Sequence, residues 1–412
     1  MSKEQLVNPM EIRKSGAICF NPVPVSQNIE NVNAHLHTPY SFSAFENLED
    51  ALDQAVRENV RIVGINDFNT TAGYDDWYEG ALKRNLYPLF NIEMISLQED
   101  DRNAGIRVND PNNPGRTYLS GKGLRYPACI PEPYASLLAD VRAKSNHQTK
   151  LMCQKLNDLP ELKQSGISLD FGRILNNLTK GAVRERHLAK ALRLEIYKHI
   201  DRGFPEFFEM LFSGKALKSH PDDFAAVENE IRGNLLKAGG PAFIPEDPTT
   251  FLPFDTVCEI ILAAGGIPTY PFLADDAKGE FTEFEQDIEK AADILKKRGI
   301  FSVEFITPRN TVEVLEQYAG YLHDNGFIVT FGSEHNTPSP EPIELFARGN
   351  IPLTNRLKQI NYEGACLIAA HQEHVRTGKQ SFSDTTGKVN TDFRESFIRE
   401  GADCIESIIS KY

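Results

Sequence analysis

Short β-type segments alternate with helical segments along two separate stretches of this chain. Extended patterns of apolar and β-branched residues cover 31–37, 61–65 and 87–95, and the intervening residues have helical spacing of apolar side chains. This order of strand, helix and strand predicts parallel strands joined by crossover helices. The chain is therefore constrained to an α/β fold in which the carboxyl ends of the strands share one edge.

The same alternation returns in the second half of the chain. Strand patterns at 266–270, 300–306 and 327–331 are separated by helical patterns at 283–298 and 311–325. Three further β/α steps of the same sheet are therefore expected.

The chain divides into three expected parts. Residues 131–253 have few β runs and several helical ones, and the proline-rich strings PACIPEP and PAFIPEDPTTFLP bound them, which predicts a mostly helical insertion domain. The segments 1–130 and 254–350 then form one α/β domain. Residues 351–412 are expected to form a helical C-terminal extension that packs on it.

The charge of the chain excludes one class of partner. It has 44 Lys and Arg residues against 58 Asp and Glu residues, a net charge of −14, and no basic block. Binding of long nucleic acid through neutralised phosphates is therefore not expected. A small anionic substrate would need a local cation, such as a metal ion or a few Arg and Lys side chains.

The targeting signals of other compartments are missing from the sequence. Residues 1–25 contain charges such as Lys3, Glu11 and Arg13, and no apolar run has the length of a secretory signal or a membrane span. The six cysteines lie far apart without a C-x-x-C pair. We expect a cytoplasmic, reduced protein without membrane association, whose oligomeric state is left open.

Side chains that metal ions prefer fall at the carboxyl ends of four of the expected strands. They are His35, His37, Asp67, Glu93, Glu334 and His335. This edge holds the active site in barrels and in open α/β sheets. In an extended H-x-H segment both imidazoles lie on one face, and imidazole with carboxylate suits Zn, Mn or Fe. The alternatives are hydrogen-bonded or surface histidines and capping roles for Asp67 and Glu334.

Two further segments are candidates for binding a substrate anion. In the loop expected at 107–124, glycines allow close approach of the backbone to a ligand, and Arg116 and Lys122 supply positive charge. In the insertion, Arg184 and His187 begin a helix that can cover the site. The alternatives are an ordinary structured loop and a solvated basic helix start.

Four strings of this chain resemble the motif series of the PHP (polymerase and histidinol phosphatase) superfamily. They are NAHLHTPYS, GINDFNT, NIEM and FGSEHNT, and their order and spacing match through about Ser96 and again from Phe254 to Asn336. The resemblance implies a distorted (β/α)7 barrel with a helical insertion and a helical C-terminal tail. It also implies hydrolysis of phosphate esters with two or three metal ions.

The resemblance assigns four ligands and also shows departures. His35 and His37 match the first ligand pair, Asp67 the acid of the second motif, and Glu93 the bridging glutamate. Positions where the family has a ligand carry other residues here, namely Phe42, Phe68, Tyr270, Asn336 and, in a loose alignment, Tyr118, while Glu334 replaces the usual Asp and His335 is displaced by one position. One or at most two divalent ions are therefore expected.

We expect a metal-dependent hydrolase, specifically a phosphoesterase acting on a small soluble phosphorylated molecule. The ion and its water would be held by the strand-end residues, including Asp67, with His335 as a ligand or a proton-transferring group and Tyr270 as a phenolic donor. Lys122 and Arg116 would fix the substrate anion. Two alternatives remain: a metal-dependent lyase or isomerase acting on a sugar or sugar acid, and a PHP-like barrel that binds a ligand without catalysis.

Overall fold

The computed structural model describes residues 29–42, 44–200, 204–337, 339 and 341–410. The segment 1–25, on which the expectation about a secretory signal rests, lies outside these residues, and so does Cys19. Within the described ranges, no helix combines the length and the apolar character that a bilayer crossing requires.

Seven strands form one barrel-shaped sheet, and their order in the sheet is their order in the chain. They are β1 (Asn31–Leu36), β2 (Val60–Phe68), β3 (Tyr87–Leu97), β4 (Arg116–Lys122), β5 (Ile267–Phe272), β6 (Ser302–Ile306) and β7 (Ile328–Gly332). Backbone hydrogen bonds from His37 N to Glu334 O (3.1 Å) and from Glu334 N to His35 O (3.0 Å) join the first strand to the end of the last. The expected distorted (β/α)7 barrel is confirmed.

Strand β4 is the irregular member of the sheet. It lies antiparallel to both β3 and β5, whereas the other neighbouring strands are parallel. The expectation of a loop throughout 107–124 is wrong for this part. Small and polar residues such as Thr117, Ser120 and Gly121 do not form the apolar pattern that predicts a strand. The segment is extended because its backbone hydrogen-bonds to the edges of β3 and β5.

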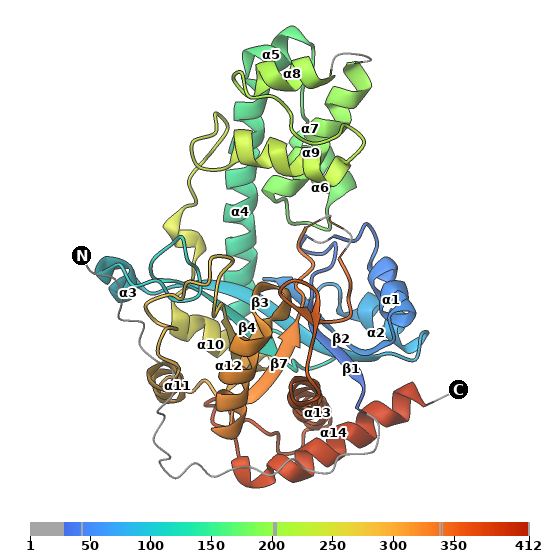
Figure 1. The fold of residues 1–412 in the computed structure, drawn as a ribbon, viewed down its shortest axis with the longest axis vertical. Helices are drawn as coiled ribbons and strands as arrows, with labels where there is room; N and C mark the ends of the chain where they lie inside the picture. The colour runs from blue at the N-terminus through green and yellow to red at the C-terminus, as the bar shows by residue number, and fades with distance from the viewer. Residues whose placement is uncertain (1–28, 43, 201–203, 338, 340, 411–412) are drawn as a thin grey trace, which may run out of the picture.

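Helices cover the outside of the barrel (Figure 1). They are α1 (Leu48–Arg57), α2 (Tyr74–Leu82), α3 (Glu99–Ala104), α10 (Phe254–Ala263), α11 (Ile288–Lys297) and α12 (Val312–Asp324). Helix α1 shows why they form there, because Leu48, Leu52 and Ala55 recur at helical spacing and are buried. The core between sheet and helices is one continuous hydrophobic cluster. Short 3-10 turns η2 (Pro248–Thr250) and η3 (Thr307–Arg309) and the small strands β8 (Phe346–Ala347) and β9 (Ile351–Pro352) complete this part.

The long helix α4 (Tyr134–Asn157) rises from the barrel and carries a group of helices at its far end (Figure 1). These are α5 (Pro160–Gln164), α6 (Phe171–Leu178), α7 (Glu185–His199), α8 (Phe204–Leu211), α9 (Phe224–Ile231) and the π-helical turn η1 (Arg232–Leu236). They share a hydrophobic cluster of their own, with Met152, Leu188 and Phe208 among its buried members. The domain boundaries 131 and 253 stay predictions.

Two C-terminal helices close the end of the barrel opposite the insertion (Figure 1). Helix α13 (Asn355–Thr377) packs on β1, β3 and β7, and α14 (Arg394–Ile409), which follows the turn η4 (Thr391–Phe393), packs on α13. Two glycines permit this contact: a Cβ at Gly364 would lie 2.0 Å from Val329 O, and one at Gly401 would lie 1.9 Å from Cys366 O. Any larger side chain there would push the layers apart.

His371 of α13 makes the packing of this helix sensitive to acid. The side chain is buried, its Nε2 donates to Gly265 O (2.9 Å), and its Nδ1 has no hydrogen-bond partner within the described part of the chain. Burial lowers the pKa of His371 to about 4, below its ordinary value of 6.5. As the pH falls, the imidazole of His371 is therefore protonated in the unfolded chain before it is protonated in the folded protein. The contribution of the neutral imidazole to the free energy of unfolding is complete above pH 6.5 and is lost as the pH falls towards 4.

We expect the free energy of unfolding to fall between pH 6.5 and 4, with His371 contributing up to about 1.4 kcal/mol per pH unit. The measurement is urea unfolding at pH 7 and pH 5. In His371→Gln the amide can still donate to Gly265 O but does not titrate, so the drop should be smaller than in the unmodified protein. Equal drops in the two proteins would contradict the assignment.

Candidate metal centre

Three side chains converge at the end of the barrel that faces the insertion. His35 lies near the end of β1, His37 directly follows that strand, and Glu93 lies in β3. The Nε2 atoms of the two histidines are 3.5 Å apart. Glu93 Oε2 lies 3.6 Å from Nε2 of His35 and 3.3 Å from Nε2 of His37. All three side chains are buried. The period-two spacing of H-x-H brings both imidazoles to the same ion-sized space, as the sequence suggested.

The donor atoms of this cluster fit a divalent ion. Although Glu93 Oε2 is buried, it has no hydrogen-bond partner among the residues that the structure describes. Nitrogen and oxygen ligands about 2.0–2.2 Å from a tetrahedral ion lie about 3.3–3.6 Å from one another. The three observed separations fall in this range, so His35, His37 and Glu93 can hold one ion with a position left open.

The charges of the cluster are strongly coupled. Burial by itself would raise the pKa of Glu93, but the adjacent imidazoles of His35 and His37 lower it to about 2. Burial would lower the pKa of His35, but the carboxylates of Glu304 and Glu93 raise it to about 9. A binding metal ion would have to displace this proton, so metal affinity should increase with pH.

A buried ion pair supports His35 from inside the barrel. Glu304 Oε2 of β6 lies 3.1 Å from His35 Nδ1 and 2.7 Å from Lys122 Nζ, and Ser120 Oγ donates to Oε1 of the same carboxylate. Lys122 also donates to Ala34 O at 3.1 Å. Burial would raise the pKa of Glu304, but Lys122 and His35 lower it well below its ordinary value. The carboxylate accepts the Nδ1 proton and so turns Nε2 towards Glu93.

Asp67 serves the turn that follows β1. Its carboxylate accepts hydrogen bonds from Thr38 N (2.7 Å), Thr38 Oγ1 (2.5 Å) and Ser41 Oγ (2.5 Å). These donors occupy both oxygens, and the structure does not bring Asp67 into the three-residue cluster. Its role as a ligand or catalytic acid stays a prediction.

The neighbouring residues Glu334 and His335, at the end of β7, contact different partners. Glu334 forms an ion pair with Arg309 and lines the cavity described below. The ring nitrogens of His335 face Ser333 Oγ (2.6 Å) and Glu341 O (3.0 Å), and the ring stacks on Phe45. The structure therefore does not direct His335 to the cluster.

Tyr270 also lies outside the cluster. The side chain is buried and its hydroxyl donates to Glu285 Oε1 at 2.7 Å. Glu285 in turn accepts from the backbone N–H groups of Leu273 (3.1 Å) and Ala274 (2.7 Å). Tyr270 thus shapes the loop beside the cavity through Glu285, and its predicted catalytic role is not what these contacts indicate.

The four residues expected to bind substrate have different surroundings. Lys122 is fully buried beside Glu304, so it does not line the cavity. Arg116 pairs with Glu246, lies 3.6 Å from Asp110 and borders a neighbouring cavity of about 310 Å³. His187 Nδ1 accepts from Arg184 N (2.9 Å) and caps α7.

Arg184 of the insertion lies over two aromatic rings beside His37. Its guanidinium lies 5.4 Å from the ring centre of Phe68 and 5.8 Å from that of Phe42. Both rings stack with His37 at centroid distances of 5.1 Å. The two phenylalanines, which stand at ligand positions of the PHP motifs, therefore form an apolar wall between His37 and this cation.

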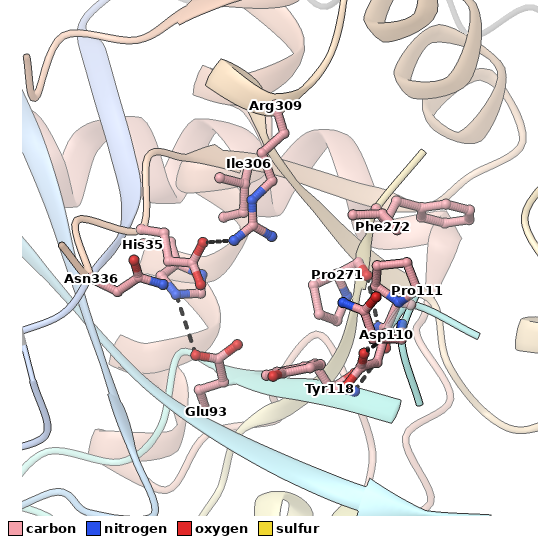
Figure 2. A pocket seen from close by; sticks show the side chains of 14 residues that line it. His35, Glu93, Asp110, Pro111, Tyr118, Pro271, Phe272, Ile306, Arg309 and Asn336 are labelled. Carbon is pink, nitrogen blue, oxygen red and sulfur yellow. Dashed lines mark hydrogen bonds and ion pairs between the residues drawn. The ribbon is translucent and has the colours of Figure 1, made fainter. Parts of the chain in front are cut away.

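A cavity of about 290 Å³ opens beside the cluster (Figure 2). Its lining includes His35, Glu93, Tyr118, Arg309, Glu334 and Asn336. Figure 2 shows His35 facing Glu93 on one side of the cavity and Arg309 on another. The guanidinium of Arg309 forms an ion pair with Glu334. Glu304 and Arg309 were not predicted from the sequence. A charged residue inside the β-branched run SVEFI was the available signal for Glu304, whereas the turn TPRN offered none for Arg309.

Known proteins similar to this chain were found by comparing structures and not by comparing sequences. No protein-family model matches the sequence, and no curated protein matches it. A provisionally assigned metal-dependent phosphoesterase from Bifidobacterium adolescentis superposes with a TM-score of 0.53 at 18% identity, over 81% of this chain and 96% of that one. An amidohydrolase from Chromobacterium violaceum, with bound sulfate and no metal, superposes with a TM-score of 0.50 at 14% identity, over 80% and 96%. This likeness shows that the chain shares its fold with these two structures, and the barrel-shaped sheet is consistent with a PHP-like fold.

Proposed function

We propose that this protein is a metal-dependent hydrolase that acts on phosphate esters of small molecules. The observation that carries the proposal is that two imidazole nitrogens and the buried carboxylate oxygen of Glu93 converge beside a cavity. Among the described residues, this oxygen has no hydrogen-bond partner. Two structures with a similar fold are named for hydrolases, one of them for a metal-dependent phosphoesterase. Both names support hydrolysis over the lyase and non-catalytic alternatives.

His35, His37 and Glu93 would hold one divalent ion, with Zn, Mn and Fe as the candidates. An ion there supplies Lewis-acid activation of a water molecule and polarises a phosphoryl oxygen. Phe42 and Phe68 have no lone pair for a second ion, and the carboxylate of Asp67 already accepts three hydrogen bonds. We therefore propose a mononuclear site.

The residues around the ion have separate tasks in this proposal. Glu304 holds the orientation of His35 through Nδ1. Burial raises the pKa of Tyr118 above its ordinary value, so its phenol stays protonated and can donate to a substrate oxygen in the cavity. The cavity volume of about 290 Å³ is at the lower end for ligand sites, which favours a small substrate.

The test is an assay of the full-length protein supplied with Zn, Mn or Fe in turn. We expect release of inorganic phosphate from small phosphomonoesters such as p-nitrophenyl phosphate, with loss of activity after chelation and recovery when the metal is restored. Amine release from N-acyl substrates and conversion of sugar acids are measured in parallel, because an amidohydrolase has a similar fold. Turnover of either of these without any phosphate release would overturn the proposal.

A further inference from the structure

We infer that Arg309 binds the anionic group of the substrate and supplies the positive charge that a second metal ion would otherwise provide. The inference rests on the proposed function, since it takes the anion to be a phosphate ester. Arg309 lines the cavity that also contains His35, Glu93 and Tyr118. Among the described residues of this lining, it is the only Lys or Arg.

Most of the hydrogen-bonding capacity of Arg309 is available to a ligand. Its side chain is 45% exposed, and within the described residues Glu334 is the one side chain to which it donates a hydrogen bond. A guanidinium has five N–H donors in a planar fork that matches two oxygens of a phosphate or carboxylate. Glu334 is contacted through Nη2, so the other N–H groups of the guanidinium can serve a ligand in the cavity that Arg309 lines.

The backbone that carries Arg309 is held firmly. It ends the 3-10 turn η3, and its carbonyl accepts from Arg348 Nε at 2.8 Å. The buried Asn310 beside it donates through Nδ2 to Leu273 O (2.7 Å) and Asp275 O (3.1 Å), and Arg348 pairs with Asp275 at 3.0 Å. A partly exposed guanidinium on a fixed backbone is suited to ligand binding, because little ordering is needed when the anion arrives.

The other nearby cations have partners that keep them from the cavity. Lys122 pairs with Glu304 inside the barrel, and Arg116 pairs with Glu246. Arg184 lies over the rings of Phe42 and Phe68. The cavity wall includes the carboxylates of Glu93 and Glu334, so an anion there needs positive charge in addition to the proposed metal ion. Among the described lining residues, Arg309 is the Lys or Arg side chain that can supply it.

Glu334 is then the counter-ion of Arg309 before an anion binds. Its negative charge lies next to the guanidinium that an anion would approach, so Glu334 would weaken the attraction between Arg309 and the substrate. Removing the charge of Glu334 should strengthen anion binding, whereas removal of a metal ligand should weaken metal binding. Glu334 was predicted to be a metal ligand. The effects of its substitution on anion binding and on metal binding distinguish that role from the role of counter-ion.

The experiment measures binding of inorganic phosphate to the purified full-length protein by calorimetry, together with metal content and melting temperature. We expect Arg309→Gln to weaken phosphate binding at least about tenfold, with Arg309→Lys intermediate because an ammonium cannot form the bidentate fork. Glu334→Gln should tighten phosphate binding severalfold at unchanged metal content. The matched control is Arg399→Gln, since Arg399 is an exposed arginine paired with one glutamate, Glu395, at 3.3 Å.

Unchanged phosphate affinity in Arg309→Gln would overturn the assignment of Arg309. Loss of metal in Glu334→Gln would overturn the counter-ion role of Glu334 and make it a ligand. The proposed function fails separately: phosphate binding that depends on Arg309, without hydrolysis of any phosphate ester, supports the anion site and refutes the phosphoesterase activity.

Discussion

The double variant His35→Ala/His37→Ala is expected to lose its bound metal ion and at least about 1,000-fold of its hydrolytic activity. Two of the three converging ligand atoms disappear in this variant, and the remaining Glu93 carboxylate cannot hold an ion alone. Elemental analysis of protein purified from cells supplied with Zn, Mn and Fe gives the metal content, and phosphate release gives the activity.

The control for this variant is His199→Ala/His220→Ala, which removes two histidines whose side chains are 37% and 76% exposed on the insertion. It should keep the metal content and activity of the unmodified protein. Circular dichroism of both variants checks that the fold is retained. If the His35/His37 variant were folded and kept its full metal content, the metal centre described here would be wrong.

Lys122→Met is expected to destabilise the protein by about 3–5 kcal/mol. Methionine has a similar length but no charge, so Glu304 would lose the cation at 2.7 Å while remaining fully buried. Both side chains are fully buried, so bulk solvent does not reach the carboxylate. Urea unfolding at pH 7 gives the change in the free energy of unfolding.

Two controls separate charge from packing in this experiment. Lys122→Met/Glu304→Gln should be less destabilised than Lys122→Met, because the buried carboxylate that has lost its lysine partner is also removed. Lys83→Met removes an exposed lysine that lies 3.8 Å from Glu79, and should change stability by less than about 1 kcal/mol. A Lys122→Met variant as stable as Lys83→Met would show that the buried pair contributes little.

Local patterns were enough to predict an α/β sheet, whereas the expectation of a barrel came from the resemblance to the PHP motifs. Apolar periodicity located six of the seven strands, because burial on the sheet and on one helix face repeats at fixed intervals along the chain. It failed for β4, whose small and polar residues pair with β3 and β5 inside the barrel. A strand that forms because its neighbours pair with its backbone does not need an apolar pattern in its own sequence.

The convergence of His35, His37 and Glu93 could also be foreseen. Strand alternation sets the face on which each side chain lies, and parallel order brings the strand ends to one edge. The sequence therefore predicted that these three residues share an edge, within a larger set that also contained Asp67, Glu334 and His335. Which carboxylate meets which partner was decided only by the tertiary structure. Glu304 contacts His35 although 269 positions separate them in the chain. The carboxylate of Asp67 accepts hydrogen bonds from Thr38 and Ser41. The left-handed backbone at Glu334 and His335 (φ of 74° and 51°) directs these two neighbours to different partners. Such choices depend on distances across the barrel and on competition between donors in space, which no spacing along the chain encodes.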